Sequence, residues 1–124
     1  MLCFILVIAG IIWYREVKKE KRNLYYENML CLSRIVTMTV AIERYNIKNI
    51  DTKNIIEYLE EDIIKELIEE KYLSSDFIKL YRNWGCVYKS HGDISTSLGE
   101  IYCKKHGNKK ELIKKVNDLV KYKK

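Results

Sequence analysis

The chain has 124 residues, of which 48% are apolar and 32% are charged, so its composition excludes a disordered protein and allows one domain with a modest core. The net charge of +6 is uneven, because residues 104–124 contain nine lysines against Glu111 and Asp118. The basic character therefore belongs to the C-terminal tail, which is typical of a solvated helix end or of contact with an anionic partner.

An uncharged apolar run, MLCFILVIAGIIWY, occupies residues 1–14. The run is shorter than the roughly 20 residues that a full membrane span needs. A helix through it would place Trp13 and Tyr14 at the level of lipid headgroups, with Arg15 reaching toward water. We therefore predict a membrane-anchoring segment and charged neck over residues 1–22; a buried core helix is the alternative. The residues predicted for insertion and assembly are Phe4, Ile5, Leu6, Val7, Ile8, Ile11 and Ile12.

The same helix is predicted to continue to about Tyr45. The chain contains no proline to interrupt it, and its apolar residues recur at spacings of three, four or seven positions. Such a helix would be roughly 65 Å long. Its apolar stripe consists of Leu24, Cys31, Ile35, Met38, Ile42 and Tyr45.

The rest of the sequence predicts shorter elements. Asp51 or Thr52 is suited to cap a second helix, whose buried face consists of Ile55, Ile56, Leu59, Ile63, Leu67 and Ile68. After a connection over residues 72–83, short apolar runs at 86–88, 94 and 101–103 are separated by glycines, which predicts a two- or three-stranded antiparallel meander. Asn108 is expected to cap a basic helix over residues 108–124, with an apolar side of Leu112, Ile113, Val116, Leu119 and Val120.

Catalytic motifs are missing from the sequence. It contains no phosphate-binding glycine loop and no nucleophile elbow. Ser90, His91, Asp93 and Ser95 have the composition of a triad, but a triad is assembled from separate segments of a chain. We therefore predict that the protein is not an enzyme.

Cys86, His91, Cys103 and His106 form the only constellation with metal-ligand chemistry in this region. Two thiols and two imidazoles can hold a tetrahedral zinc ion. A small sheet that brings Cys86 near Cys103 suits a disulfide equally well. Two free or buried thiols are the third interpretation.

Three segments together resemble type IV pilin-like proteins, including the pseudopilins of type II secretion and competence systems. The family's apolar N-terminal helix is similar to FILVIAGII at residues 4–12, and its continuation resembles CLSRIVTMTVAIERYN at residues 31–46. The family's C-terminal pattern is similar to Tyr72-Leu73, Cys86 and then GEIYCKKHG at residues 99–107. The resemblance implies an α+β fold, in which a long N-terminal helix packs on a small antiparallel sheet, here with additional helices. It also implies a pilin-like globular domain over residues 23–107.

Family members usually carry a short basic leader, a glycine cleavage site, an early glutamate and a helix proline, and this sequence has none of them. Either the true start lies upstream of Met1, or the chain is not processed and polymerised like a pilin. The basic neck also places the C-terminal domain in the cytoplasm by the positive-inside rule, whereas the family has this domain outside. An upstream basic leader would remove the conflict.

The resemblance implies a structural subunit of a cell-envelope filament used in secretion, motility or DNA uptake. Its partners would be copies of itself, other pilin-like subunits and membrane lipid, and no cofactor is expected. The expected location is the bacterial inner membrane, single-pass, with the C-terminal domain extracytoplasmic and stapled by a disulfide between Cys86 and Cys103. The alternative is a membrane-anchored module with the zinc site described above and a basic tail that contacts nucleic acid or anionic lipid through Lys109, Lys110, Lys114 and Lys115.

Overall fold

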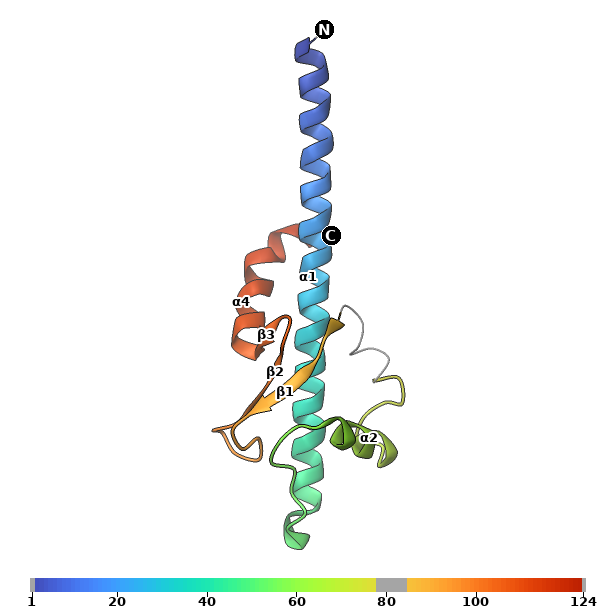
Figure 1. The fold of residues 1–124 in the computed structure, drawn as a ribbon, viewed down its shortest axis with the longest axis vertical. Helices are drawn as coiled ribbons and strands as arrows, with labels where there is room; N and C mark the ends of the chain where they lie inside the picture. Colours follow the sequence, from blue (N-terminus) through green and yellow to red (C-terminus); the bar gives the residue numbers. More distant parts are fainter. Residues whose placement is uncertain (1, 78–84, 124) are drawn as a thin grey trace.

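One long helix, α1 (Leu2–Lys48), forms the spine of the computed structural model, which describes residues 2–77 and 85–123. The helix contains 47 residues and is therefore about 70 Å long. Figure 1 shows that its N-terminal part stands free, while the other elements pack around its C-terminal part. The predicted long helix is confirmed, and it ends at Lys48 rather than at Tyr45.

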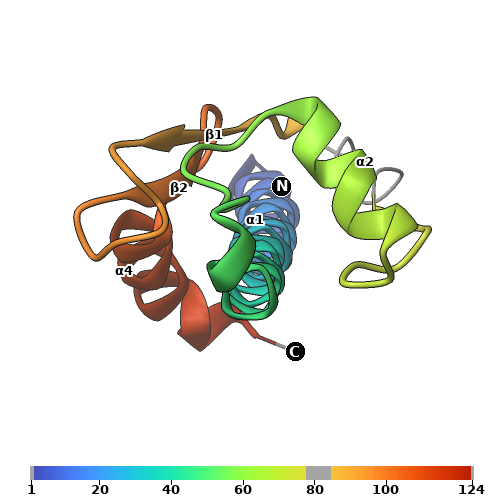
Figure 2. The ribbon, with the colours of Figure 1, turned by 90° about the horizontal axis from the view of Figure 1, so that it is seen from below.

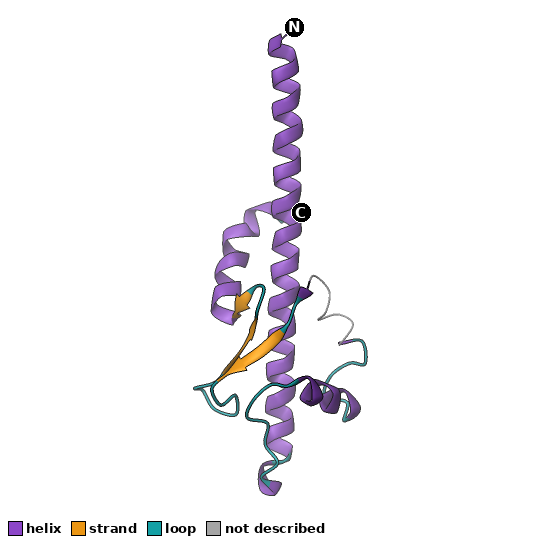
Figure 3. Ribbon diagram, viewed as in Figure 1, coloured by secondary structure: helices purple, strands orange, loops and turns teal. Residues whose placement is uncertain are grey.

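The remaining elements surround α1 on several sides, as the view along the helix shows (Figure 2). Together with α1 they make an α+β fold, as predicted (Figure 3). In chain order they are the 3-10 turn η1 (Ile50–Thr52), α2 (Glu61–Glu69), β1 (Tyr88–His91), β2 (Glu100–Cys103), β3 (Gly107–Asn108), α4 (Lys109–Leu119) and the 3-10 turn η3 (Val120–Tyr122).

The core is built on the predicted stripe of α1, which is buried from Cys31 to Tyr45. Leu24 was predicted to extend this stripe, but its side chain is exposed and Tyr25 is buried instead, against Val116 and Leu119. The reason is that α4 and η3 cover α1 at this level, from a different side than the sheet and α2 (Figure 2). At the level of Tyr25, the buried face of α1 is therefore the face that contacts α4.

The second predicted helix is shorter than expected, because residues 53–60 are not helical and α2 begins at Glu61. The side chain of Asn46 explains this difference. Its Oδ1 accepts a hydrogen bond from the Ile56 backbone N–H at 2.7 Å, and its Nδ2 donates to the Ile56 carbonyl at 3.1 Å. These two bonds satisfy the backbone N–H and carbonyl of Ile56, as a neighbouring strand would. Ile56 can therefore be buried in an extended segment rather than in a helix.

The predicted antiparallel meander is confirmed, with strand order β1-β2-β3. Tyr88 in β1 lies opposite Cys103 in β2. Ile94 was predicted to be strand-like, but it lies in the loop between these strands, where its N–H donates to the Glu57 carbonyl at 2.8 Å. The predicted connection over residues 72–83 lies partly outside the described residues.

Asn108 caps α4 as predicted. Its side chain accepts a hydrogen bond from the Glu111 backbone N–H at 2.8 Å, and the Glu111 carboxylate accepts one from the Asn108 N–H at 3.3 Å. Leu112, Val116 and Leu119 are buried, whereas two residues predicted for the same face are exposed: Ile113 and Val120.

The predicted inner-membrane location is contradicted. Within the described residues, no helix has both the length and the apolar content that a membrane crossing requires. The uncharged part of α1 ends at Tyr14 and is followed directly by Arg15 and Glu16, short of the roughly 20 apolar residues of a span. The prediction of a single-pass inner-membrane protein is therefore wrong.

Candidate functional site

Residues 4–14 of α1, which we call the apolar arm, extend beyond the rest of the protein (Figure 1). The exposed fraction is 71% for Phe4, 43% for Ile8 and 68% for Trp13. Residues 4–8 are apolar without interruption, and five consecutive residues cover more than one full helical turn. The arm is therefore apolar on all sides. All the residues predicted for assembly are exposed on it: Phe4, Ile5, Leu6, Val7, Ile8, Ile11 and Ile12.

A second apolar surface, which we call the lateral face, lies farther along α1. Its exposed members are Tyr26, Met29, Leu30, Val36 and Val40. Several of them line a groove of about 510 Å³, together with Leu32, Ser33 and Thr37. Separations of three, four and seven residues place them on one side of the helix.

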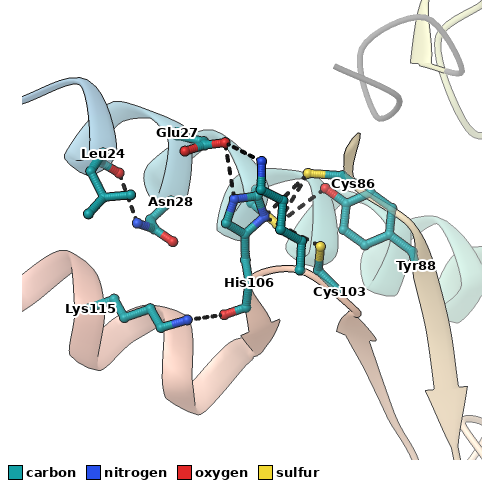
Figure 4. A network of polar contacts seen from close by, with 10 residues as sticks. Leu24, Glu27, Asn28, Cys86, Tyr88, Cys103, His106 and Lys115 are labelled. Atoms are coloured by element: carbon teal, nitrogen blue, oxygen red, sulfur yellow. Dashed lines mark hydrogen bonds and ion pairs between the residues drawn. The ribbon is translucent and has the colours of Figure 1, made fainter. Parts of the chain in front are cut away.

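A cluster of Cys31, Cys86, Cys103 and His106, which we call the thiol cluster, is buried where α1 meets the sheet (Figure 4). The three sulfur atoms and one ring nitrogen of His106 all lie within 4.8 Å of one another. His106 Nδ1 is 3.4 Å from the sulfur of Cys86 and 3.4 Å from that of Cys103. The sulfur atoms of Cys31 and Cys86 are 4.0 Å apart.

The fold explains why these four residues meet. The Lys104 N–H donates to the Val87 carbonyl at 2.9 Å, which extends the pairing of β1 with β2 and brings Cys86 toward Cys103. The turn after Cys103 returns the chain through Gly107, whose φ of +104° favours glycine. A Cβ at Gly107 would also lie 2.9 Å from the Glu111 carboxylate. This turn directs His106 back toward Cys103.

Burial shifts the pKa values of three members of the thiol cluster: Cys31, Cys86 and His106. Loss of water contact raises the pKa of the Cys31 thiol, and this outweighs the hydrogen bond that the Tyr88 hydroxyl donates to its sulfur at 3.4 Å. Burial likewise raises the pKa of the Cys86 thiol and lowers the pKa of His106. These thiols are therefore protonated and the imidazole is neutral at neutral pH.

Charged groups surround the other side of the His106 ring (Figure 4). Glu27 Oε1 is 3.3 Å from His106 Nε2 and 3.2 Å from Lys105 Nζ, and Lys115 Nζ donates to the His106 carbonyl at 2.6 Å. Nε2 is buried and has no well-aligned hydrogen bond among the described residues, so Glu27 is its electrostatic partner. A cavity of about 410 Å³, lined by Glu27, His106 and Lys115 among others, lies beside the ring.

The structure replaces one member of the predicted metal-ligand set. His91 lies outside the thiol cluster, exposed and stacked on the Tyr102 ring with centroids 4.2 Å apart. It is five residues from Cys86 along an extended chain, a separation of roughly 16 Å. Cys31 takes its place. The signal for Cys31 was its position on the apolar stripe of α1, where it was predicted only as a core residue.

Cys86 and Cys103 come together as both the disulfide and the zinc predictions required. All four cysteines are free thiols in the structure, with Cys3 exposed and the others buried. The disulfide between Cys86 and Cys103 stays a prediction.

Of the lysines predicted to contact anions, Lys109, Lys110 and Lys114 are exposed on α4, whereas the Lys115 amine is bonded to the His106 carbonyl. Contact with nucleic acid stays a prediction. No protein-family model matches the chain, and neither a curated protein nor a solved structure shows a significant match to it.

Proposed function

We propose that this protein is a structural subunit that assembles with copies of itself through the apolar arm of α1, in a filament of the pilin-like kind. The exposed apolar arm is the observation that carries this proposal. Soluble monomers rarely leave a continuous apolar surface of this size open, and such surfaces mark interaction sites.

The size of the arm favours several neighbours rather than one. Fully burying one large apolar side chain contributes about 1.5–3 kcal/mol, so covering the seven assembly residues would contribute about 10–20 kcal/mol. Association costs roughly 4–15 kcal/mol in lost freedom of motion. Because the arm is apolar on every side, a single partner helix would leave much of it exposed, whereas a bundle of arms would cover it.

The lateral face supplies a surface for the arm of a neighbouring copy. It is apolar and grooved, and it lies on the same helix about three turns beyond the arm. Copies that are staggered along a common axis would place the arm of one against the lateral face of the next. A stagger repeated in one direction does not close, so it produces a filament rather than a dimer.

The resemblance to type IV pilin-like proteins supports the same arrangement, since subunits of that family bundle through the apolar end of a long N-terminal helix. The family further suggests a filament used in secretion, motility or DNA uptake. No chemical step is part of this role, and the C-terminal half would form the outer surface of the assembly.

Leu6→Asp is expected to abolish or greatly weaken assembly. Leu6 is 65% exposed in the single chain, so the substitution leaves the fold intact but places a charge where a neighbour would bury it. Leu98→Asp is the matched control, because Leu98 is 87% exposed on the loop between β1 and β2. Sedimentation velocity over a range of concentrations should show large assemblies for the wild type and for Leu98→Asp. Leu6→Asp should raise the concentration needed for assembly by about tenfold or more.

Two outcomes would contradict the proposal. The first is a wild-type protein that stays at the monomer mass of 14.9 kDa at every concentration. The second is a wild-type protein that stays monomeric but binds lipid vesicles in a way that Leu6→Asp removes, since the arm would then contact lipid instead of other copies.

A further inference from the structure

We propose that Cys31, Cys86, Cys103 and His106 bind a zinc ion, which fastens α1 to the sheet and to the turn before β3. This site goes beyond the proposed assembly, and neither depends on the other. Cys31 belongs to α1, Cys86 precedes β1, Cys103 ends β2 and His106 lies in the turn that follows. One ion would therefore connect segments that are far apart in the sequence.

The distances fit a single tetrahedral ion. With zinc–sulfur bonds of about 2.3 Å and zinc–nitrogen bonds of about 2.0–2.1 Å, two sulfur ligands lie about 3.8 Å apart and a sulfur and a nitrogen about 3.5 Å apart. The corresponding distances here are 4.0 Å between the sulfurs of Cys31 and Cys86, and 3.4 Å from His106 Nδ1 to the sulfurs of Cys86 and Cys103. The other three pairs of ligand atoms lie within 4.8 Å of one another, so shifts of at most about 1 Å would complete the tetrahedron.

The surroundings orient the ligands. A zinc-bound histidine commonly directs its second ring nitrogen at a carboxylate, which fixes the tautomer and the ring orientation. Here His106 presents Nδ1 to the sulfur atoms and Nε2 to Glu27, at 3.3 Å (Figure 4). The Tyr88 hydroxyl points at the Cys31 sulfur at 3.4 Å and would stabilise a thiolate there.

Charge and protons balance in the bound state. Three thiols release three protons to the solvent when they ligate Zn²⁺ through sulfur, and no electron is transferred. Three thiolates, one neutral imidazole and Zn²⁺ leave a charge of −1 on the site. Glu27 adds another negative charge, and Lys105 and Lys115, which both lie close to His106, offset the two.

The donor set selects the metal and the type of site. Thiolate and imidazole ligands in tetrahedral arrangement favour zinc. Because all four positions come from the protein and are buried, no position is left open for a substrate, which is the pattern of a structural zinc site. A disulfide between Cys86 and Cys103 would account for two of the four residues and would leave Cys31 and His106 without a role.

Metal content tests the site directly. Full-length protein, reduced and then dialysed against zinc without chelator, is expected to retain about one zinc per chain by elemental analysis. Cobalt should replace it and give the visible absorption of a tetrahedral thiolate site. Cys31→Ser and His106→Ala should each weaken binding more than about 100-fold, and Glu27→Gln about 10- to 100-fold. The matched controls are Cys3→Ser, His91→Ala and Glu20→Gln, which alter exposed residues and should bind like the wild type.

Three results would overturn the proposal. One is a reduced wild-type protein that binds neither zinc nor cobalt. This test does not depend on whether a variant folds. Another is Cys31→Ser with the affinity of Cys3→Ser. The third is purified protein that carries iron, or that shows two free thiols when unfolded without reductant instead of the four present here. Sedimentation velocity with and without chelator distinguishes a failure of the zinc proposal from a failure of the assembly proposal. Removing zinc leaves the apolar arm unchanged, so assembly should be the same in both conditions.

Discussion

Replacing Gly99 by alanine is expected to destabilise the protein by about 3 kcal/mol or more, because the added methyl group would overlap backbone that cannot move aside. A Cβ at Gly99 would lie 2.2 Å from the Asp93 carbonyl carbon and 2.4 Å from the Ile94 nitrogen. Ile94 is held in turn by the hydrogen bond from its N–H to the Glu57 carbonyl. Relieving the overlap would therefore disturb the contact between this loop and the segment before α2.

Gly10→Ala is the matched control, since a Cβ at Gly10 would meet nothing within 4 Å. In a helix this change stabilises by up to about 1 kcal/mol. Urea unfolding followed by circular dichroism would measure both variants, with Leu6→Asp present in each so that assembly does not add to the measured stability. Equal stabilities for Gly99→Ala and Gly10→Ala would show that the loop is not packed as described.

Leu112→Ala is expected to lower the free energy of unfolding by about 2–5 kcal/mol. Leu112 is fully buried and belongs to the main core, although α4 lies near the end of the chain. Its removal leaves a cavity between α4 and α1. The neighbouring substitution Ile113→Ala, at a position 41% exposed, should cost less than about 1 kcal/mol. A loss for Leu112→Ala no larger than that for Ile113→Ala would mean that α4 does not pack on α1.

The features that the sequence predicted well are those that depend on local pattern. The long helix follows from the absence of proline and from helical spacing, and the Asn108 cap follows from a polar residue before a periodic segment. The meander follows from short apolar runs between glycines. Each of these signals acts within a few residues, so each can be recognised without knowledge of what packs against it.

The features that were missed depend on contacts between distant segments. Helix α2 begins late because Asn46 bonds to the Ile56 backbone, and no local pattern contains that pair. Tyr25 replaces Leu24 in the core because α4 lies on that side of α1. His91 was included among the metal ligands because it is close in sequence, whereas Cys31 joins the thiol cluster from a helix that ends far upstream. The inner-membrane location was predicted from a short apolar run together with the family resemblance, and no helix of the described residues is both long and apolar enough to cross a membrane.

A spin label on Cys3 tests the central claim most directly, because Cys3 is the exposed cysteine and precedes the apolar arm by one residue. The label reports on the arm itself in an otherwise unaltered chain. Electron paramagnetic resonance at increasing protein concentration should show the label becoming immobilised and broadened by labels on neighbouring copies, and Leu6→Asp should prevent both changes. A spectrum that stays sharp and mobile at every concentration would contradict assembly through the arm.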